Sequence, residues 1–354
     1  MTRSLVWKMA ALALTAGWCA FSQPAALDRG DGRPERRLPT PTPSGPVPVL
    51  GSVTAMPGNT CLMTPGVPNS KCQVVQVSCP NLKPLLCDLD VTSPTTSPST
   101  WRGTVVMGSG EGGHGFYGGQ TGGKSIIERL VALGFQVVDR SWEDTSGWTT
   151  NEAGNVVETC RYASMLTWVH ANLHKVGKFV ATGNSGGSAE ISYALSTWDR
   201  GGILDLALPT SGPPLGRLDY ACAAPGTPQY TYWAAHCLDK VPTAQMQCPT
   251  GETCFLAPQA DVCIQNPQWG GRPTEAELLG DSVAHPGAAM SYPNLVHFLY
   301  GEQDCAEPVP IGLSYSTNIT SKTIIGYVPN TPHELYSTQE GQDAIVNAID
   351  DGTK

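Results

Sequence analysis

The sequence is poor in charged residues, which occupy 14% of its 354 positions. Basic residues are the scarcer kind: 21 Lys and Arg face 30 Asp and Glu, and the formal net charge is −9. Because neutralisation of phosphates requires clustered Lys and Arg, we expect no nucleic-acid partner. With 40% hydrophobic residues, the chain has enough apolar side chains for a packed core in one large α/β domain or in two small domains.

Long hydrophobic runs are missing after the first 22 residues. A helix that crosses a bilayer needs about 20 consecutive apolar residues, so we expect no membrane span in the mature protein. At the N-terminus, two basic residues precede the apolar run MAALALTAGWCAF, a pattern typical of a secretory signal. We predict a signal peptide over residues 1–22, cleaved after Ser22, and therefore a secreted or periplasmic protein. A lipoprotein anchor at Cys19 is the alternative, which the bulky Trp18 disfavours.

Closely spaced metal-binding cysteine pairs are also missing. The nearest pattern, CPTGETC at Cys248 and Cys254, is wider than a CxxC pair and is followed by no matching pair of histidines, so we predict no metal site and no cofactor. Removal of Cys19 with the signal leaves 11 of the 12 cysteines. In an exported chain these predict disulfides, and the odd number leaves at least one thiol free or paired between chains.

Composition divides the rest of the chain into three parts. Residues 23–60 are rich in Pro, Gly, Ser and Thr and predict a disordered or extended leader. Residues 61–354 predict one α/β domain. Within that domain, residues 213–290 contain many Pro and Gly, five cysteines and little periodicity, and we predict an inserted cap that disulfides staple. The chain has no internal repeat.

Segments typical of strands and helices alternate on both sides of the predicted cap. After an initial hairpin, this alternation predicts an α/β fold with a mostly parallel central sheet flanked by helices. The expected hairpin strands are KCQVVQVSCP and LKPLLCDLDV, the later strands are WRGTVVM, FQVVDRSW, KFVATG, LDLALPTSG, LVHFLYG and TIIGYV, and the helices are KSIIERLVALG, ETCRYASMLTWVHANLHK, SAEISYALSTW, IGLSYSTNI and EGQDAIVNAI.

The string GNSGG at residues 183–187 is the first candidate for chemistry. GxSxG alone is a weak signal, but an apolar strand that enters it and a helix that leaves it are typical of a nucleophile elbow. In such a turn the serine hydroxyl points out of the sheet, and the helix N-terminus adds a partial positive charge. A phosphate-binding turn is the alternative, although no Lys follows the glycines as in a P-loop. We predict Ser185 as the nucleophile.

A serine hydroxyl needs a base, and the base needs an orienting acid. His333 lies in PNTPHEL, just after the last expected strand, where its loop reaches the same sheet edge as Ser185. We predict His333 as the base. The acid is expected after the preceding strand, LVHFLYG, which leads into GEQD. We predict Asp304, with Glu302 as the alternative.

The oxyanion of acyl transfer needs N–H donors that are already in place. We expect one from the backbone of Gly186 and the other from the loop GSGEGG that follows WRGTVVM. Glu111 is the predicted donor in this loop and Gly110 the alternative, while a flexible glycine hinge is the other interpretation. His114 and Tyr117 come next and are candidates for the pocket entrance.

Scattered tryptophans are usually packing residues, but an aromatic platform for substrate is a second hypothesis for four of them. These are Trp142, Trp148, Trp233 and Trp269.

From about residue 72 to 350 the chain resembles the α/β-hydrolase superfamily. GEQDCAEPVP is similar to the acid loop of its esterases and lipases, and VPNTPHELYSTQEGQDAIVNAI to their histidine loop and last helix. The order Ser, Asp, His is also the order in that superfamily. The chain departs from it in one respect: Ser109-Gly110 replaces the usual His-Gly before the oxyanion loop. More loosely, the cap and leader resemble those of secreted polyester depolymerases, cutinases and feruloyl esterases.

This resemblance implies a serine hydrolase that needs no cofactor and cleaves a small-molecule or polymeric carboxylic ester. A serine peptidase on the same fold is an alternative, although the cap has no obvious charged cluster for a peptide terminus. A secreted binding protein without catalysis is another, and loss of a triad residue would mark it. None is lost here. The oligomeric state stays open.

Overall fold

The computed structural model describes residues 48–62, 66–144, 147–150, 153–221, 274–304 and 308–354. The predicted signal peptide, most of the predicted leader and the central part of the predicted cap lie outside these residues. Within the described part of the chain, no helix combines the length and apolar character needed to cross a membrane.

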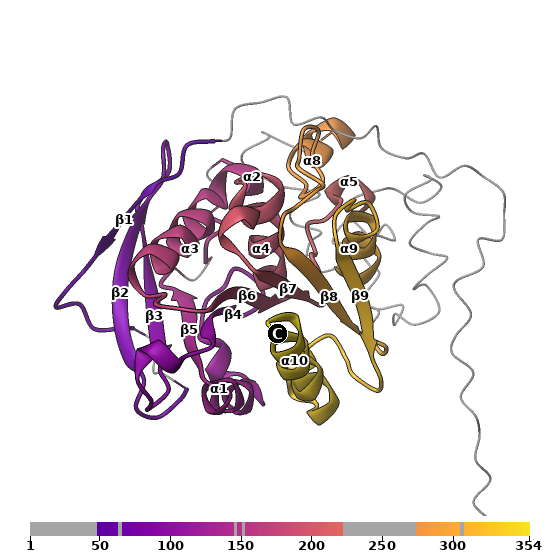
Figure 1. Ribbon diagram of the computed structural model, residues 1–354. Helices are drawn as coiled ribbons and strands as arrows, with labels where there is room; N and C mark the ends of the chain where they lie inside the picture. Colours follow the sequence, from indigo (N-terminus) through magenta and orange to yellow (C-terminus); the bar gives the residue numbers. More distant parts are fainter. Residues whose placement is uncertain (1–47, 63–65, 145–146, 151–152, 222–273, 305–307) are drawn as a thin grey trace, which may run out of the picture. The chain divides into compact units, whose positions relative to one another are not determined.

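A sheet forms the centre of the domain (Figure 1). Among the described residues it has nine strands in the order β1-β2-β3-β5-β4-β6-β7-β8-β9. From β1 to β5 neighbouring strands pair antiparallel, and from β5 to β9 all pairs are parallel. The strands are β1 (Ser52–Ala55), β2 (Lys71–Ser78), β3 (Leu85–Thr92), β4 (Gly103–Gly108), β5 (Phe135–Trp142), β6 (Lys178–Asn184), β7 (Leu206–Thr210), β8 (Leu295–Gly301) and β9 (Thr323–Val328).

The strands β4 and β7 consist mainly of valine, leucine, alanine and other apolar or small residues. β4, β5 and β7 are buried along their whole length. Parallel strands with helices on both faces have no solvent side, which is why β4 and β7 show continuous apolar character instead of alternation. β5 differs, because four of its eight buried residues are polar, namely Gln136, Asp139, Arg140 and Ser141.

Helices cover both faces of the sheet (Figure 1). One apolar cluster joins the sheet to α3, α4 and α9, and a second joins the opposite face to α1 and α10. The helices are α1 (Gly123–Ala132), α2 (Asn155–Glu158), α3 (Cys160–Asn172), α4 (Gly186–Ser196), α5 (Leu218–Ala221), α8 (Glu275–Gly280), α9 (Pro308–Ser316) and α10 (Gln339–Gly352). Short 3-10 turns are η1 (Pro98–Thr100), η2 (Tyr117–Gly119), η3 (Arg200–Ile203) and η6 (Leu335–Ser337).

The expected hairpin, the later strands and the expected helices are all present, so the predicted fold class is confirmed. The start of the sheet differs from the prediction. Residues 52–55, assigned to the leader, form β1 and pair antiparallel with β2 from Ser52 opposite Ser78 to Ala55 opposite Val75. A four-residue edge strand between Pro- and Gly-rich neighbours has too few residues to show a period, and only its backbone pairing with β2 reveals it.

The two described ends of the predicted cap meet each other. Val283 N–H donates to the Leu215 carbonyl (2.9 Å), and Ala284 N–H donates to the Gly216 carbonyl (3.1 Å). The chain therefore leaves the sheet after β7 and returns beside its point of departure before β8. Residues 222–273 lie outside the described residues.

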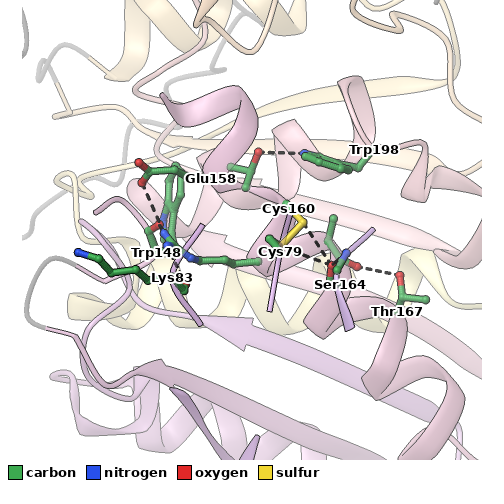
Figure 2. Close-up of a disulfide and its surroundings, with 12 residues drawn as sticks. Cys79, Lys83, Trp148, Glu158, Cys160, Ser164, Thr167 and Trp198 are labelled. Atoms are coloured by element: carbon green, nitrogen blue, oxygen red, sulfur yellow. Dashed lines mark hydrogen bonds and ion pairs between the residues drawn. A yellow bond between two sulfur atoms is a disulfide. The ribbon is translucent and has the colours of Figure 1, made fainter. Parts of the chain in front are cut away.

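Two disulfides, Cys61–Cys72 and Cys79–Cys160, confirm the prediction of disulfide bonds. Cys79–Cys160 ties the end of β2 to the first residue of α3, with Ser164 beside the sulfurs (Figure 2). The Ser164 hydroxyl also accepts the N–H of Gly51 (2.8 Å). Among the described cysteines Cys87 is the free one, and burial raises the pKa of its thiol. The remaining cysteines lie outside the described residues.

Candidate active site

Ser185 is the single residue between β6, which ends at Asn184, and α4, which begins at Gly186. Its backbone has φ 51° and ψ −114°. A non-glycine residue rarely adopts a positive φ, and such strain persists only where the surroundings hold it. Here the Ser185 N–H donates to the Thr210 carbonyl at the end of β7 (2.9 Å). This is the strained strand-to-helix turn that the GNSGG string predicts.

Small residues around Ser185 are a steric requirement of the turn. A Cβ built on Gly187 would lie 2.7 Å from the carbonyl oxygens of both Gly108 and Ser109, and one on Gly183 would lie 2.8 Å from the carbonyl carbon of Gly187. Neither backbone can give way without displacing β4 or α4. A bulkier side chain at either glycine would therefore collide with the backbone.

His333 and Asp304 meet at the same edge of the sheet. His333 follows β9 and Asp304 follows β8, and His333 Nδ1 lies 2.9 Å from Asp304 Oδ2. The Asp304 side chain is 0% exposed and that of His333 is 22% exposed. A carboxylate only accepts, so Nδ1 carries the proton of this bond and Nε2 carries the lone pair of the neutral ring. That tautomer is the one a general base requires.

Glu302, the alternative acid, lies in the turn after β8 and is exposed. Its backbone N–H donates to the Val328 carbonyl (3.0 Å). The structure therefore gives His333 a buried carboxylate partner in Asp304 and places Glu302 at the surface.

Backbone hydrogen bonds connect the candidate residues across the sheet edge. The Ser185 bond to β7 is followed by one from β7 to β8 and by one between the loops that carry Asp304 and His333. The latter two are Ser211 N–H to the Leu299 carbonyl (2.8 Å) and Gln303 N–H to the Thr331 carbonyl (3.0 Å). The carboxyl ends of the parallel strands thus hold the three loops in one row.

The glycine-rich loop after β4 lies against this turn. A Cβ built on Gly186 would collide with the carbonyl group of Glu111 and would lie 2.8 Å from its backbone nitrogen, and one on Gly110 would be 3.4 Å from Ser185 Cβ. Glu111 has φ 49°, and Gly113 N–H donates to the Gly110 carbonyl (2.9 Å). The Glu111 side chain is exposed. It is therefore the backbone of Glu111, rather than its carboxylate, that adjoins Gly186 and the candidate nucleophile.

One aromatic candidate near the site is wrong, and for two tryptophans the packing interpretation is confirmed over the platform hypothesis. Tyr117 does not line an entrance: it is buried, and its ring packs edge-on against Tyr336 at 5.1 Å between centroids. Trp142 and Trp148 are buried as well and offer no platform to a substrate. Large aromatic side chains stabilise the fold through the apolar area that they bury. The sequence does not show which elements pack over these side chains. Trp233 and Trp269 lie outside the described residues.

A buried carboxylate holds η2, the 3-10 turn that follows the glycine-rich loop. Asp139 on β5 accepts the N–H groups of Tyr117 (2.9 Å) and Gly118 (2.7 Å). Burial raises the pKa of Asp139 to about 7, although the two hydrogen bonds oppose this shift. Between about pH 4 and pH 7 the folded protein therefore keeps a proton that the unfolded chain releases.

This raised pKa predicts that the contribution of Asp139 to stability falls as the pH rises from about 4 to 7. The unfolded state binds fewer protons in that range, so the contribution of Asp139 is complete below about pH 4 and is lost progressively toward pH 7. Asp139→Asn cannot titrate, and the difference in unfolding free energy between wild type and variant should change by roughly 1.4 kcal/mol per pH unit. Urea unfolding at pH 4.5, 5.5 and 6.5 measures it. Because burial also raises the pKa of Asp281, to about 6, only this difference isolates Asp139. Parallel stability curves would contradict the assignment.

Among the described residues, no group of three or more His, Cys, Asp or Glu is placed to hold a metal ion.

No protein-family model matches the sequence, and a search of curated proteins finds no match either. Solved structures do match. Brefeldin A esterase, described as a bacterial homologue of human hormone-sensitive lipase, aligns with a TM-score of 0.55 at 14% identity, over 83% of this chain and 80% of its own. The esterase Est22 aligns with a TM-score of 0.53 at 12% identity, over 81% of each chain.

The chain has the α/β-hydrolase fold. In this fold the nucleophile elbow, the acid loop and the histidine loop all lie at the carboxyl edge of the sheet. In this chain Ser185 follows β6, Asp304 follows β8 and His333 follows β9. At these identities the likeness concerns the fold, and the chemistry has to be argued from the site.

Proposed function

We propose that this protein is a serine hydrolase that cleaves carboxylic esters through an acyl-enzyme on Ser185. The observation that carries the proposal is the buried Asp304 carboxylate on His333 Nδ1, at the same sheet edge as a serine held at φ 51°. This combination of a strained serine, an oriented imidazole and a buried acid is the arrangement that activates a hydroxyl. Both structural neighbours named above are esterases, which supports the same class of substrate.

In the proposed reaction His333 Nε2 accepts the hydroxyl proton as Ser185 Oγ attacks the ester carbonyl carbon. The backbone N–H groups of Gly186 and Glu111 stabilise the oxyanion of the tetrahedral intermediate. His333 then gives the proton to the leaving alcohol, and the acyl group stays on Ser185. Water, deprotonated by His333, repeats the sequence and releases the acid. Asp304 stays ionised throughout and stabilises the imidazolium.

The N-terminal signal pattern and the two disulfides support export as the setting of this activity. A protein that works outside the cytosol benefits from the cross-link between β2 and α3, because a covalent tie limits the freedom of the unfolded chain. The proposed substrates are accordingly esters met outside the cytosol, small or polymeric.

The test is hydrolysis of p-nitrophenyl esters from acetate to palmitate by the purified mature protein, with parallel labelling by a fluorophosphonate. We expect turnover of at least one ester and a phosphonyl adduct on the peptide that contains Ser185. The chain-length profile then separates an esterase from a lipase. Absence of turnover together with labelling at another residue would contradict the proposal.

A further inference from the structure

The guanidinium of Arg140, on β5, lies beneath the glycine-rich loop. Its Nη1 donates to the Gly113 carbonyl (2.8 Å) and its Nη2 to the Ser109 carbonyl (3.3 Å). These carbonyls flank the turn in which Gly113 N–H donates to the Gly110 carbonyl. The side chain of Arg140 is 0% exposed. One buried cation therefore holds both ends of the turn that presents Glu111.

The other side of the guanidinium faces the helix that follows the candidate nucleophile. Arg140 Nη2 forms an ion pair with Glu190 on α4, and the Glu190 side chain is also 0% exposed. The second carboxylate oxygen of Glu190 accepts the indole N–H of Trp142 (2.7 Å). Since α4 begins directly after Ser185, the Arg140–Glu190 pair links the glycine-rich loop to the element that carries the nucleophile.

Two glycines of the loop make room for this cation. A Cβ built on Gly108 would lie 2.9 Å from Arg140 Nε, and one on Gly113 would lie 2.7 Å from Arg140 Cζ. Any larger residue would push the guanidinium away from the carbonyls. The two glycines therefore allow the loop backbone to pack directly against the Arg140 guanidinium, and the loop does not act as a flexible hinge.

The support also sets the direction of the amides. Within a planar trans peptide, the C=O and the following N–H point in opposite directions. With the Ser109 and Gly113 carbonyls drawn down onto Arg140, and the Gly110 carbonyl engaged by Gly113 N–H, the peptide plane that carries Glu111 N–H is held from both sides. A donor placed before the reaction begins stabilises a developing oxyanion far better than one that must reorganise.

We propose that Arg140 and Glu190 are positioning residues that hold the oxyanion loop in register with Ser185. The inference rests on the proposed function, because it assigns the pair to that same site. Stability alone does not explain the pair, since a buried ion pair replaced by apolar residues of similar volume often leaves a protein equally stable. What apolar residues cannot supply is the pair of donors to the loop carbonyls.

The test is the double variant Arg140→Met/Glu190→Leu, which removes both buried charges together. We expect a thermal midpoint close to the wild type, a kcat for p-nitrophenyl ester hydrolysis reduced about 100-fold, and a KM changed less than about 3-fold, as for loss of one preorganised donor.

Either single variant leaves an uncompensated buried charge and should unfold more readily. Arg140→Lys keeps the charge but cannot reach both carbonyls and Glu190 at once, so it should also lose kcat while remaining folded. Wild-type kcat in the folded double variant, or in Arg140→Lys should the double variant not fold, would overturn the inference.

Hydrogen exchange separates this inference from the proposed function. In the folded variant, amides of the peptide that covers residues 108–116 should exchange faster, while those of α10 stay unchanged. Unchanged exchange in the loop would overturn the positioning role whatever the activity. If the wild-type protein hydrolyses no ester and yet the loop exchanges faster in the variant, the support is real and it is the proposed function that has failed.

Discussion

Ser185→Ala is expected to lower kcat for ester hydrolysis about 10⁶-fold, to the level that binding and oxyanion stabilisation alone provide. The variant removes the only atom that forms the proposed acyl-enzyme. The strained backbone conformation of the turn should be retained in the variant. The hydrogen bond from Ser185 N–H to the Thr210 carbonyl and the contacts of the neighbouring glycines stabilise it, and none of these involves the hydroxyl. Steady-state kinetics with circular dichroism as a check of folding measures the effect.

The helix that follows Ser185 offers a matched control. Ser192 on α4 is buried, and its hydroxyl has no hydrogen-bond partner among the residues that the structure describes. Ser192→Ala should therefore leave kcat within about 2-fold of wild type and stability equal or slightly higher, because an unsatisfied buried hydroxyl is removed. Equal activity of Ser185→Ala and wild type would show that the nucleophile is another residue.

Asp304→Asn should lower kcat about 10⁴-fold, the second largest effect we expect. The amide keeps the shape of the carboxylate but can present an N–H to His333 Nδ1, which favours the tautomer with its proton on Nε2. That imidazole cannot accept the Ser185 proton. Because the Asp304 side chain is fully buried, water offers little compensation. KM should change little, since Asp304 is assigned no contact with substrate.

Glu302→Gln is the control for this variant. It makes the same acid-to-amide change two residues earlier in the same turn, on an exposed side chain. We expect kcat within about 2-fold of wild type, as for most surface substitutions. The reverse result, with Glu302→Gln inactive and Asp304→Asn active, would identify Glu302 as the acid.

The order of strands and helices could be predicted from the sequence because it depends on local information. Short apolar runs mark β4, β6, β7 and β8, and the period of apolar residues marks α1, α3 and α10. Ser185, Asp304 and His333 were candidates for the same reason, since each lies in the loop that follows a strand: β6, β8 and β9 respectively. A residue that ends a parallel strand is carried to the carboxyl edge of the sheet by the topology itself.

Other features depend on residues that are far apart in the chain. β1 forms because its backbone pairs with the edge of β2. The burial of Trp142 and Tyr117 depends on which elements pack over them. Arg140 and Glu190 are 50 residues apart and lie inside segments that look like an ordinary strand and helix. No periodicity indicates that one carries a buried cation and the other its partner.

The sequence by itself thus determined the α/β architecture, the disulfide-forming character and the three candidate catalytic positions, because local apolar periods and strand ends specify them. Only the tertiary structure decided that Asp304 rather than Glu302 meets His333, and that the glycine-rich loop rests on a buried ion pair. Both depend on which side chains are excluded from water and on distances between distant segments. Tertiary packing determines both, and the residues adjacent in the sequence give no indication of them.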